Sequence, residues 1–128
     1  MTQFEEYRKK NQFMTHNFIR PEMAEENSSR VYAEVREESR NPYGYVHGGL
    51  LMTMADCAAG MAARGDGRKY VTQNISIHFI ANIKEGGLTA DAQVIHRGRT
   101  VTLVRVEIKA ETGKLLAEAS VSMFCVAE

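Results

Sequence analysis

Several residue types are scarce in this 128-residue sequence, and its charges cancel. It contains no tryptophan, two prolines and two cysteines, and 16 Lys and Arg residues balance 16 Asp and Glu residues. The zero net charge provides no electrostatic attraction to nucleic acid or to an anionic membrane. No apolar run approaches the roughly 20 residues of a membrane span, and residues 1–17 lack the apolar core of a signal peptide. We therefore expect a cytoplasmic protein that binds neither nucleic acid nor membrane.

The cysteines and histidines show no spacing typical of a metal site. Cys57 and Cys125 lie far apart in apolar stretches, which predicts reduced thiols in the core of a cytosolic protein. None of the four histidines has metal-ligand spacing with another. The sequence therefore predicts no metal centre.

Length and composition indicate one globular domain over residues 1–128. Apolar residues make up 44% and charged residues 25% of the chain, close to the globular average. Residues 1–25 are expected to form an N-terminal helical segment, because apolar side chains recur among charges from Phe4 to Phe13 in the pattern of a short amphipathic helix.

The rest of the chain predicts a long helix and five strands. Residues 47–63 read HGGLLMTMADCAAGMAA, a stretch of good helix formers that is apolar nearly all round. Alternating apolar residues predict strands over 31–35, 71–79, 88–94, 104–110 and 117–125. Val101 and Leu103 are out of phase with Val104, which a bulge or a strand buried on both faces would explain.

This order of elements predicts an α+β fold, with an antiparallel sheet curled around one central helix. A single sheet covers only part of such a helix, so a helix that is apolar on every side needs a second covering surface. A partner subunit would supply it, and we expect a homodimer at least.

Three residues near this helix are candidates for chemistry. Asp56 lies among alanines in mid-helix, where an unpaired carboxylate is costly unless it is used or structurally paired. Gly48 follows His47 at the helix start, where free backbone N–H groups stabilise negative charge; glycine there also permits close packing. Asn41 precedes a proline, and its amide is suited either to donating to the same oxygen or to forming a turn.

The spacing of these candidates constrains how they act together. Gly48 and Asp56 are eight residues apart, which is about 12 Å along a helix axis. A small reacting group cannot touch both within one chain. If both act on one bond, Asp56 of one subunit faces Gly48 of another.

Two sequence motifs resemble one family. The run NPYGYVHGG, followed by MADCAAG, resembles the hotdog-fold acyl-CoA thioesterases of the phenylacetate-degradation (PaaI-like) type, and the later strands VTQNISIHFI and GGLTADAQVIHRGRT are similar to that family too. The resemblance covers residues 31–126. It implies a hotdog fold, hydrolysis of an acyl-CoA thioester, no metal or organic cofactor, and a dimer of dimers.

The resemblance also implies roles for individual residues. Asn41 and Gly48 would polarise the thioester carbonyl, and Asp56 of the other subunit would act as base for water or as nucleophile. His47 would lie beside the leaving sulfur. A hydroxyl residue early in the next strand would hold the water; we select Thr72, although Tyr70 and Asn74 could also take that place.

Substrate contacts and two alternatives remain open. Basic loops of the family lie near the coenzyme A phosphates, so the turn Arg97-Gly98-Arg99 is a candidate contact, although most basic turns are simply solvated. A hotdog hydratase or dehydratase would need His47 and a carboxylate together as acid and base. A non-catalytic acyl-CoA sensor would need an output module, for which the roughly 25 residues before the first expected strand are too few for a DNA-binding domain.

Overall fold

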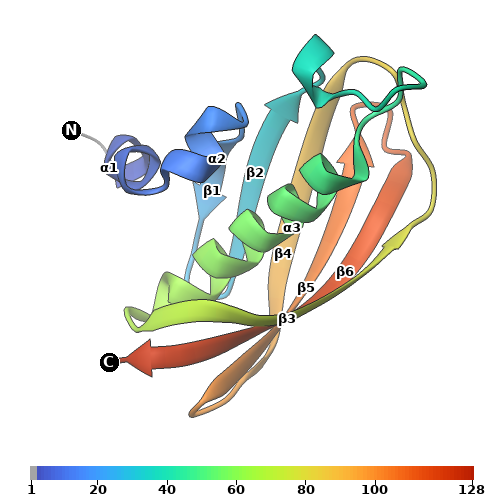
Figure 1. The fold of residues 1–128 in the computed structure, drawn as a ribbon. Coiled ribbons are helices and arrows are strands. Elements are labelled where there is room, and N and C mark those ends of the chain that lie inside the picture. Colours follow the sequence, from blue (N-terminus) through green and yellow to red (C-terminus); the bar gives the residue numbers. More distant parts are fainter. Residues whose placement is uncertain (1–2) are drawn as a thin grey trace.

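The structure is a computed structural model that describes residues 3–128. Two short helices open the chain, and one long helix lies between the second and third strands (Figure 1). The helices are α1 (Gln3–Lys10), α2 (Gln12–His16) and α3 (Gly48–Ala63), with short 3-10 helices η1 (Glu37–Ser39) and η2 (Arg64–Asp66). The strands are β1 (Arg20–Ala24), β2 (Ser28–Glu34), β3 (Lys69–Phe79), β4 (Gly87–Arg97), β5 (Val101–Ala110) and β6 (Leu115–Ala127).

The six strands form one antiparallel sheet in the order β1-β2-β4-β5-β6-β3. The sheet curves around α3, which lies across one of its faces (Figure 1). This confirms the predicted α+β class, the hotdog architecture and all five predicted strands. The sheet supplies the layer against which the apolar helix is buried.

The N-terminal segment differs from the single helix predicted over residues 4–13. The helix breaks at Asn11, whose side-chain oxygen accepts the backbone N–H of Met14 at 3.1 Å and so begins α2. The helical segment expected over residues 1–25 is also wrong at its end, where Arg20–Ala24 form strand β1; this strand was not predicted, because its sequence RPEMA has no alternation and contains Pro21. Strand β1 is an edge strand, where a missing proline N–H is tolerated.

Near Val101 the irregularity is in the neighbouring strand β4, and β5 itself is regular. Val94 pairs with Val104 and His96 pairs with Leu103, so Ile95 is the extra residue in β4. In β5 the simple alternation continues, since Thr102 is fully buried. Leu103 points outward and is 36% exposed. Neither explanation offered by the sequence applies to β5, which has no bulge near Val101 and is not buried on both faces; Val101 and Leu103 are apolar residues on its outer side.

Helix α3 is covered unevenly. Its residues from Cys57 to Ala63 are all buried, whereas Gly49, Met52, Thr53 and Asp56 form a stripe that is exposed or half-buried. The helix is therefore not enclosed on every side within one chain, and its N-terminal half keeps an open face. Cys57 is buried and Cys125 is half-buried, and both are free thiols.

Strand β3 forms the edge of the sheet beside this open face. It pairs with β6 on one side, and on its other side no strand of residues 3–128 pairs with it. An unpaired edge eleven residues long offers a row of backbone N–H and C=O groups to another strand. Within residues 3–128, no helix is long and apolar enough to span a membrane.

Candidate active site

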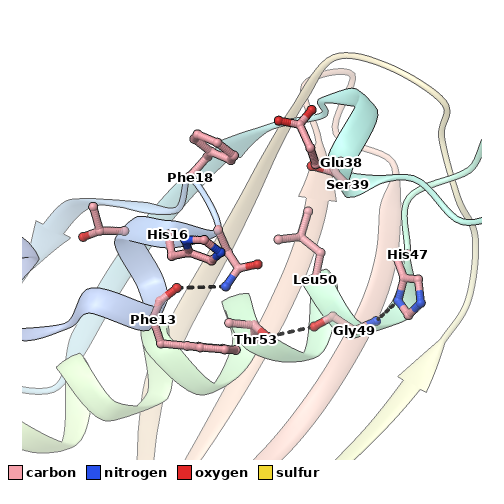
Figure 2. Close-up of a pocket in the computed structure, with 11 residues that line it drawn as sticks. Phe13, His16, Phe18, Glu38, Ser39, His47, Gly49, Leu50 and Thr53 are labelled. Atoms are coloured by element: carbon pink, nitrogen blue, oxygen red, sulfur yellow. Dashed lines mark hydrogen bonds between the residues drawn. The ribbon is translucent and has the colours of Figure 1, made fainter.

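The N-terminus of α3 is capped by the side chain of His47. Its Nδ1 accepts the backbone N–H of Gly49 at 2.9 Å (Figure 2). Since Nδ1 is the acceptor, a neutral His47 carries its proton on Nε2. The backbone N–H of Gly48 has no hydrogen-bond partner among residues 3–128. One free donor therefore remains at the positive end of the helix dipole.

Asn41 forms the turn that leads to this helix and still keeps a free donor. Its Oδ1 accepts the backbone N–H groups of Tyr43 at 2.9 Å and Tyr45 at 3.1 Å. This fixes the orientation of the amide, because the oxygen must face the turn. Its NH₂ group has no hydrogen-bond partner within the described part of the chain. The turn and the donor roles considered for Asn41 are therefore compatible.

Asp56 lies halfway along α3 and contacts β3. The Thr72 hydroxyl donates to Asp56 Oδ1 at 2.5 Å, and both side chains line a cavity of about 450 Å³. Asp56 is half-buried, so one face of its carboxylate is open to the cavity. Of the three candidates for holding water, Thr72 alone bonds to Asp56. The Tyr70 hydroxyl donates to Asp66 at 2.6 Å, and Asn74 is exposed without a side-chain hydrogen bond to a described residue.

The N-terminal segment lines this cavity, a role that the sequence did not predict. Tyr7, Asn11 and Phe13 line it together with Arg64, which follows α3. Tyr7 and Asn11 are four residues apart, a spacing that places two side chains on one side of a helical segment and could have signalled a shared target. Cys57 also lines the cavity, but burial and then the Asp56 carboxylate raise the pKa of its thiol to about 12. This thiol stays protonated and is no nucleophile.

A second cavity of about 720 Å³ lies beside the first, nearer the start of α3. His47, Gly49 and Leu50 form one wall, and α2 with its following turn forms the opposite wall (Figure 2). Phe13 and Thr53 line both cavities. Within one chain, His47 lines the second cavity and Asp56 lines the first.

At the other end of α3, Arg97 is held by the protein itself. Its Nε donates to Asn27, Nη1 to the Ala63 carbonyl and to Asp66, and Nη2 to the carbonyls of Glu26 and Ala62, all within 2.8–3.1 Å. These bonds use all five donors of the guanidinium. The predicted phosphate contact is therefore not available to Arg97 in this fold. Its role is to bind the last carbonyls of α3.

The rest of the basic turn divides between structure and solvent. Gly98 belongs to the tight turn between β4 and β5, where an added Cβ would collide with the Val101 carbonyl oxygen. Arg68 donates to the carbonyls of Gly98 at 2.9 Å and Arg99 at 2.7 Å. The Arg99 side chain is exposed and has no hydrogen-bond partner among residues 3–128. Of the three predicted contacts, only Arg99 keeps its donors free.

No group of three or more His, Cys, Asp or Glu side chains among residues 3–128 is arranged to hold a metal ion. His47 is occupied as a helix cap, and His78 and His96 are exposed on strands. The chemistry available at this site is therefore that of one carboxylate, one hydroxyl and a set of hydrogen-bond donors.

Comparison with known sequences finds relatives named as a hydrolase and as an esterase. A 1,4-dihydroxy-2-naphthoyl-CoA hydrolase of Listeria monocytogenes is 33% identical over 95 residues, which is 72% of this chain and 77% of that protein. A protein of Saccharolobus solfataricus named as an esterase is 36% identical over 86 residues, which cover 66% of this chain but only 61% of the relative.

Comparison with solved structures gives the same fold. A hypothetical thioesterase of Streptococcus pneumoniae, solved with coenzyme A, superposes with a TM-score of 0.82 at 29% identity, covering 86% of this chain and 90% of that one. Two further structures of that protein carry alanine in place of an aspartate and of a threonine 16 positions later. The sequence profile of the thioesterase superfamily matches residues 43–117, from the Asn41 turn region into β6. With this match and its central helix wrapped by a six-stranded sheet, the chain belongs to the thioesterase superfamily.

Proposed function

We propose that this protein hydrolyses an acyl-CoA thioester to the free acid and coenzyme A. The observation that carries the proposal is the Asp56 carboxylate, which accepts the Thr72 hydroxyl at 2.5 Å and opens onto a cavity. A carboxylate held in this way is suited to activate water. A thioester is already an activated acyl donor, so one carboxylate and an oxyanion site are sufficient machinery.

The proposed reaction uses the free donors at the start of α3. The Gly48 N–H and the Asn41 NH₂ bind the carbonyl oxygen and stabilise the negative charge that develops there. Asp56 takes a proton from water as the water oxygen attacks the carbonyl carbon, and Thr72 fixes the carboxylate. The C–S bond then breaks, and the sulfur leaves as thiolate or takes a proton. The Nε2–H of His47 is placed to donate to that sulfur. In the alternative route, Asp56 attacks the carbonyl directly and water releases the acyl group.

The active site is proposed to lie between two chains. Asp56 and Gly48 are separated by about two turns of α3. His47, next to Gly48, lines a different cavity from Asp56. The unpaired edge of β3 and the open stripe of α3 lie next to each other, so one partner could cover both. We propose a homodimer at least, assembled further as a dimer of dimers, in which Asp56 of one subunit serves Asn41 and Gly48 of the other.

The relatives support coenzyme A as the carrier. The Listeria protein is named for hydrolysis of a coenzyme A thioester, and the Streptococcus pneumoniae structure contains coenzyme A. The aspartate and threonine varied in that protein have the same separation as Asp56 and Thr72. Within the superfamily, the motifs around Asn41 and Asp56 favour the phenylacetate-degradation type.

A panel of acyl-CoA thioesters tests the reaction type. Release of free thiol without a change in enoyl absorbance is expected for hydrolysis. A change in enoyl absorbance without thiol release would instead identify a hydratase or dehydratase. Saturable binding with neither signal would identify an acyl-CoA binding protein.

Mixed refolding tests the shared site. Asn41→Ala and Asp56→Ala are each expected to be inactive. When equal amounts are unfolded and refolded together, random pairing makes half the dimers mixed, and each mixed dimer holds one intact site of two. Activity should recover to roughly a quarter of the parent protein. If each site were built within one chain, every site would carry a defect and activity would stay at the level of the single variants.

A further inference from the structure

The cavity that contains Asp56 extends along α3 and ends at a second polar cluster, formed by Tyr7, Asn11 and Arg64. Arg64 is eight residues beyond Asp56, about 12 Å along the helix axis. Its side chain turns back toward Asp56 over Gly60, where an added Cβ would lie 2.6 Å from Arg64 Nη1. The absence of a side chain at Gly60 therefore lets the guanidinium lie against the helix, at the end of the cavity.

The cluster contains hydrogen-bond donors and no carboxylate. The Tyr7 hydroxyl accepts Asn11 Nδ2 at 3.3 Å and Arg64 Nη1 at 3.5 Å. The amide of Asn11 cannot turn round, because its oxygen caps α2 through Met14. Among residues 3–128, no group accepts the Tyr7 proton, and no acidic side chain forms an ion pair with Arg64.

The charge state of Tyr7 keeps it a donor. Burial is the main cause that raises the pKa of its hydroxyl above the ordinary value, so it remains protonated at neutral pH. A phenol that accepts two hydrogen bonds and donates none, next to a guanidinium without a counter-ion, is complementary to an oxygen acceptor. The other side chains that line this cavity are mostly apolar or weakly polar, among them Met52, Cys57 and Met123.

We propose that Tyr7, Asn11 and Arg64 determine the acyl specificity by binding the far end of the acyl group. That end carries an oxygen hydrogen-bond acceptor, and a carboxylate suits the unpaired charge of Arg64 best. The inference rests on the proposed thioester hydrolysis, which places the carbonyl carbon beside Asp56. The part of the acyl group between the two ends is apolar and lies against the middle of the cavity.

Matched substrates test this assignment. Octanoyl-CoA is compared with two analogues in which the terminal methyl is replaced by a hydroxyl or by a carboxylate, and the same three are made with a hexanoyl chain. For at least one chain length, kcat/KM should be about tenfold or more higher for the carboxylate than for the methyl form, with the hydroxyl between them. A higher kcat/KM for the hydroxyl form than for the carboxylate form would support a site for an oxygen acceptor but contradict the choice of a carboxylate. A kcat/KM for the methyl forms that equals or exceeds that of both polar forms would contradict the proposed site.

Two variants identify the residues responsible. Arg64→Met and Tyr7→Phe keep most of the side-chain volume, and each should bring the carboxylate-to-methyl ratio of kcat/KM close to one. Gly60→Ala should lower the ratio in the same direction, because it displaces the guanidinium. Arg8→Met, an exposed arginine of α1, is the control and should leave the ratio unchanged. An unchanged ratio in both Tyr7→Phe and Arg64→Met would contradict the proposal.

A binding measurement separates this proposal from the hydrolysis itself. Thioether analogues of the same coenzyme A compounds cannot be hydrolysed, and their affinities are measured by calorimetry on the parent protein and on Arg64→Met. Tighter binding of the carboxylate-terminated thioether, lost in the variant, supports the cluster even if no thioester is turned over. Equal affinities for the methyl and carboxylate forms overturn it even if hydrolysis is confirmed.

Discussion

The two ends of α3 carry polar clusters of opposite character. At the C-terminal end, Asp66 accepts hydrogen bonds from Arg68, Tyr70 and Arg97, and the Arg97 guanidinium uses every donor it has. At the N-terminal end, Gly48 and Asn41 keep donors without partners in the described chain. Asn41 and Gly48 are both half-buried, so their donors are open to water or to a ligand, whereas those of Arg97 are used within the protein.

This difference shows which of the proposed substrate contacts are still available to a ligand. Arg97 ends strand β4 and Asn41 lies in the turn before α3, and both were candidates for substrate contact. Only the hydrogen-bond partners distinguish them, because Arg97 is fully paired within the protein and Asn41 is paired through its oxygen alone. Substitutions at the two ends should therefore affect different measurements, activity at one end and stability at the other.

The largest expected effect is on turnover, from Asp56→Asn. The substitution keeps the shape of the side chain and removes the charge that activates water, so kcat should fall by about 10² to 10⁴. Thermal melting should change little. Asp91→Asn is the control, since Asp91 pairs with Arg30 and is 38% exposed, far along the chain from the site. Turnover of Asp56→Asn within a few-fold of the parent would remove Asp56 from the mechanism, and a large loss of stability would make it structural.

The next effect is on stability, from Arg97→Met. It removes the hydrogen bonds that Arg97 donates to the carbonyls of Ala62 and Ala63 and to the Asp66 carboxylate, which should lower the free energy of unfolding by about 3 kcal/mol. Urea denaturation measures this change in the free energy of unfolding, and kcat per folded molecule should be nearly unchanged. Arg105→Met is the matched control, because Arg105 is 57% exposed and its ion pairs are 3.5 and 3.8 Å long. Equal losses in the two variants would show that the Arg97 cluster has no special role.

A smaller effect is on the pH dependence of stability, through Asp66. Burial by itself raises the pKa of Asp66, but hydrogen bonds from Tyr70 and Arg68 and the charge of Arg97 outweigh it and hold that pKa well below its usual range. Because the folded state binds this proton more weakly than the unfolded state, the stabilisation is complete above pH about 4 and is lost as the pH falls further. Urea midpoints between neutral and acidic pH should fall more steeply for the parent than for Asp66→Asn. Parallel curves would contradict this assignment.

The smallest effect is on substrate affinity, from Arg99→Met. Arg99 is exposed and its side chain is free, so a contact with coenzyme A phosphates would be screened and weak. We expect KM for acyl-CoA to rise a few-fold, with kcat unchanged, because such a contact binds ground state and transition state alike. The change should disappear with N-acetylcysteamine thioesters, which lack the nucleotide. The same rise on both substrates would assign Arg99 to another role.

The sequence was sufficient for most of the fold because the long elements depend on local pattern. Alternation of apolar residues predicted all five longer strands, and the apolar run after His47 predicted α3. The separation of Gly48 and Asp56 follows from helix geometry alone, and the structure places His47 and Asp56 in separate cavities. Strand β1 was not predicted because its sequence has no periodic pattern. The helix break at Asn11 was not predicted because it depends on a single side-chain cap.

The amino-acid sequence by itself determined the sheet around a central helix, the carboxylate at Asp56 and the turn at Asn41. Only the tertiary structure decided that Arg97 binds the end of α3, that Thr72 contacts Asp56, and that Tyr7 and Arg64 end the same cavity. The physical reason is the separation along the chain of the residues that make contact. Periodicity and capping act between residues a few positions apart, whereas these contacts join residues 16, 34 and 57 positions apart. Which donor meets which acceptor over such separations is fixed only when the whole chain has packed.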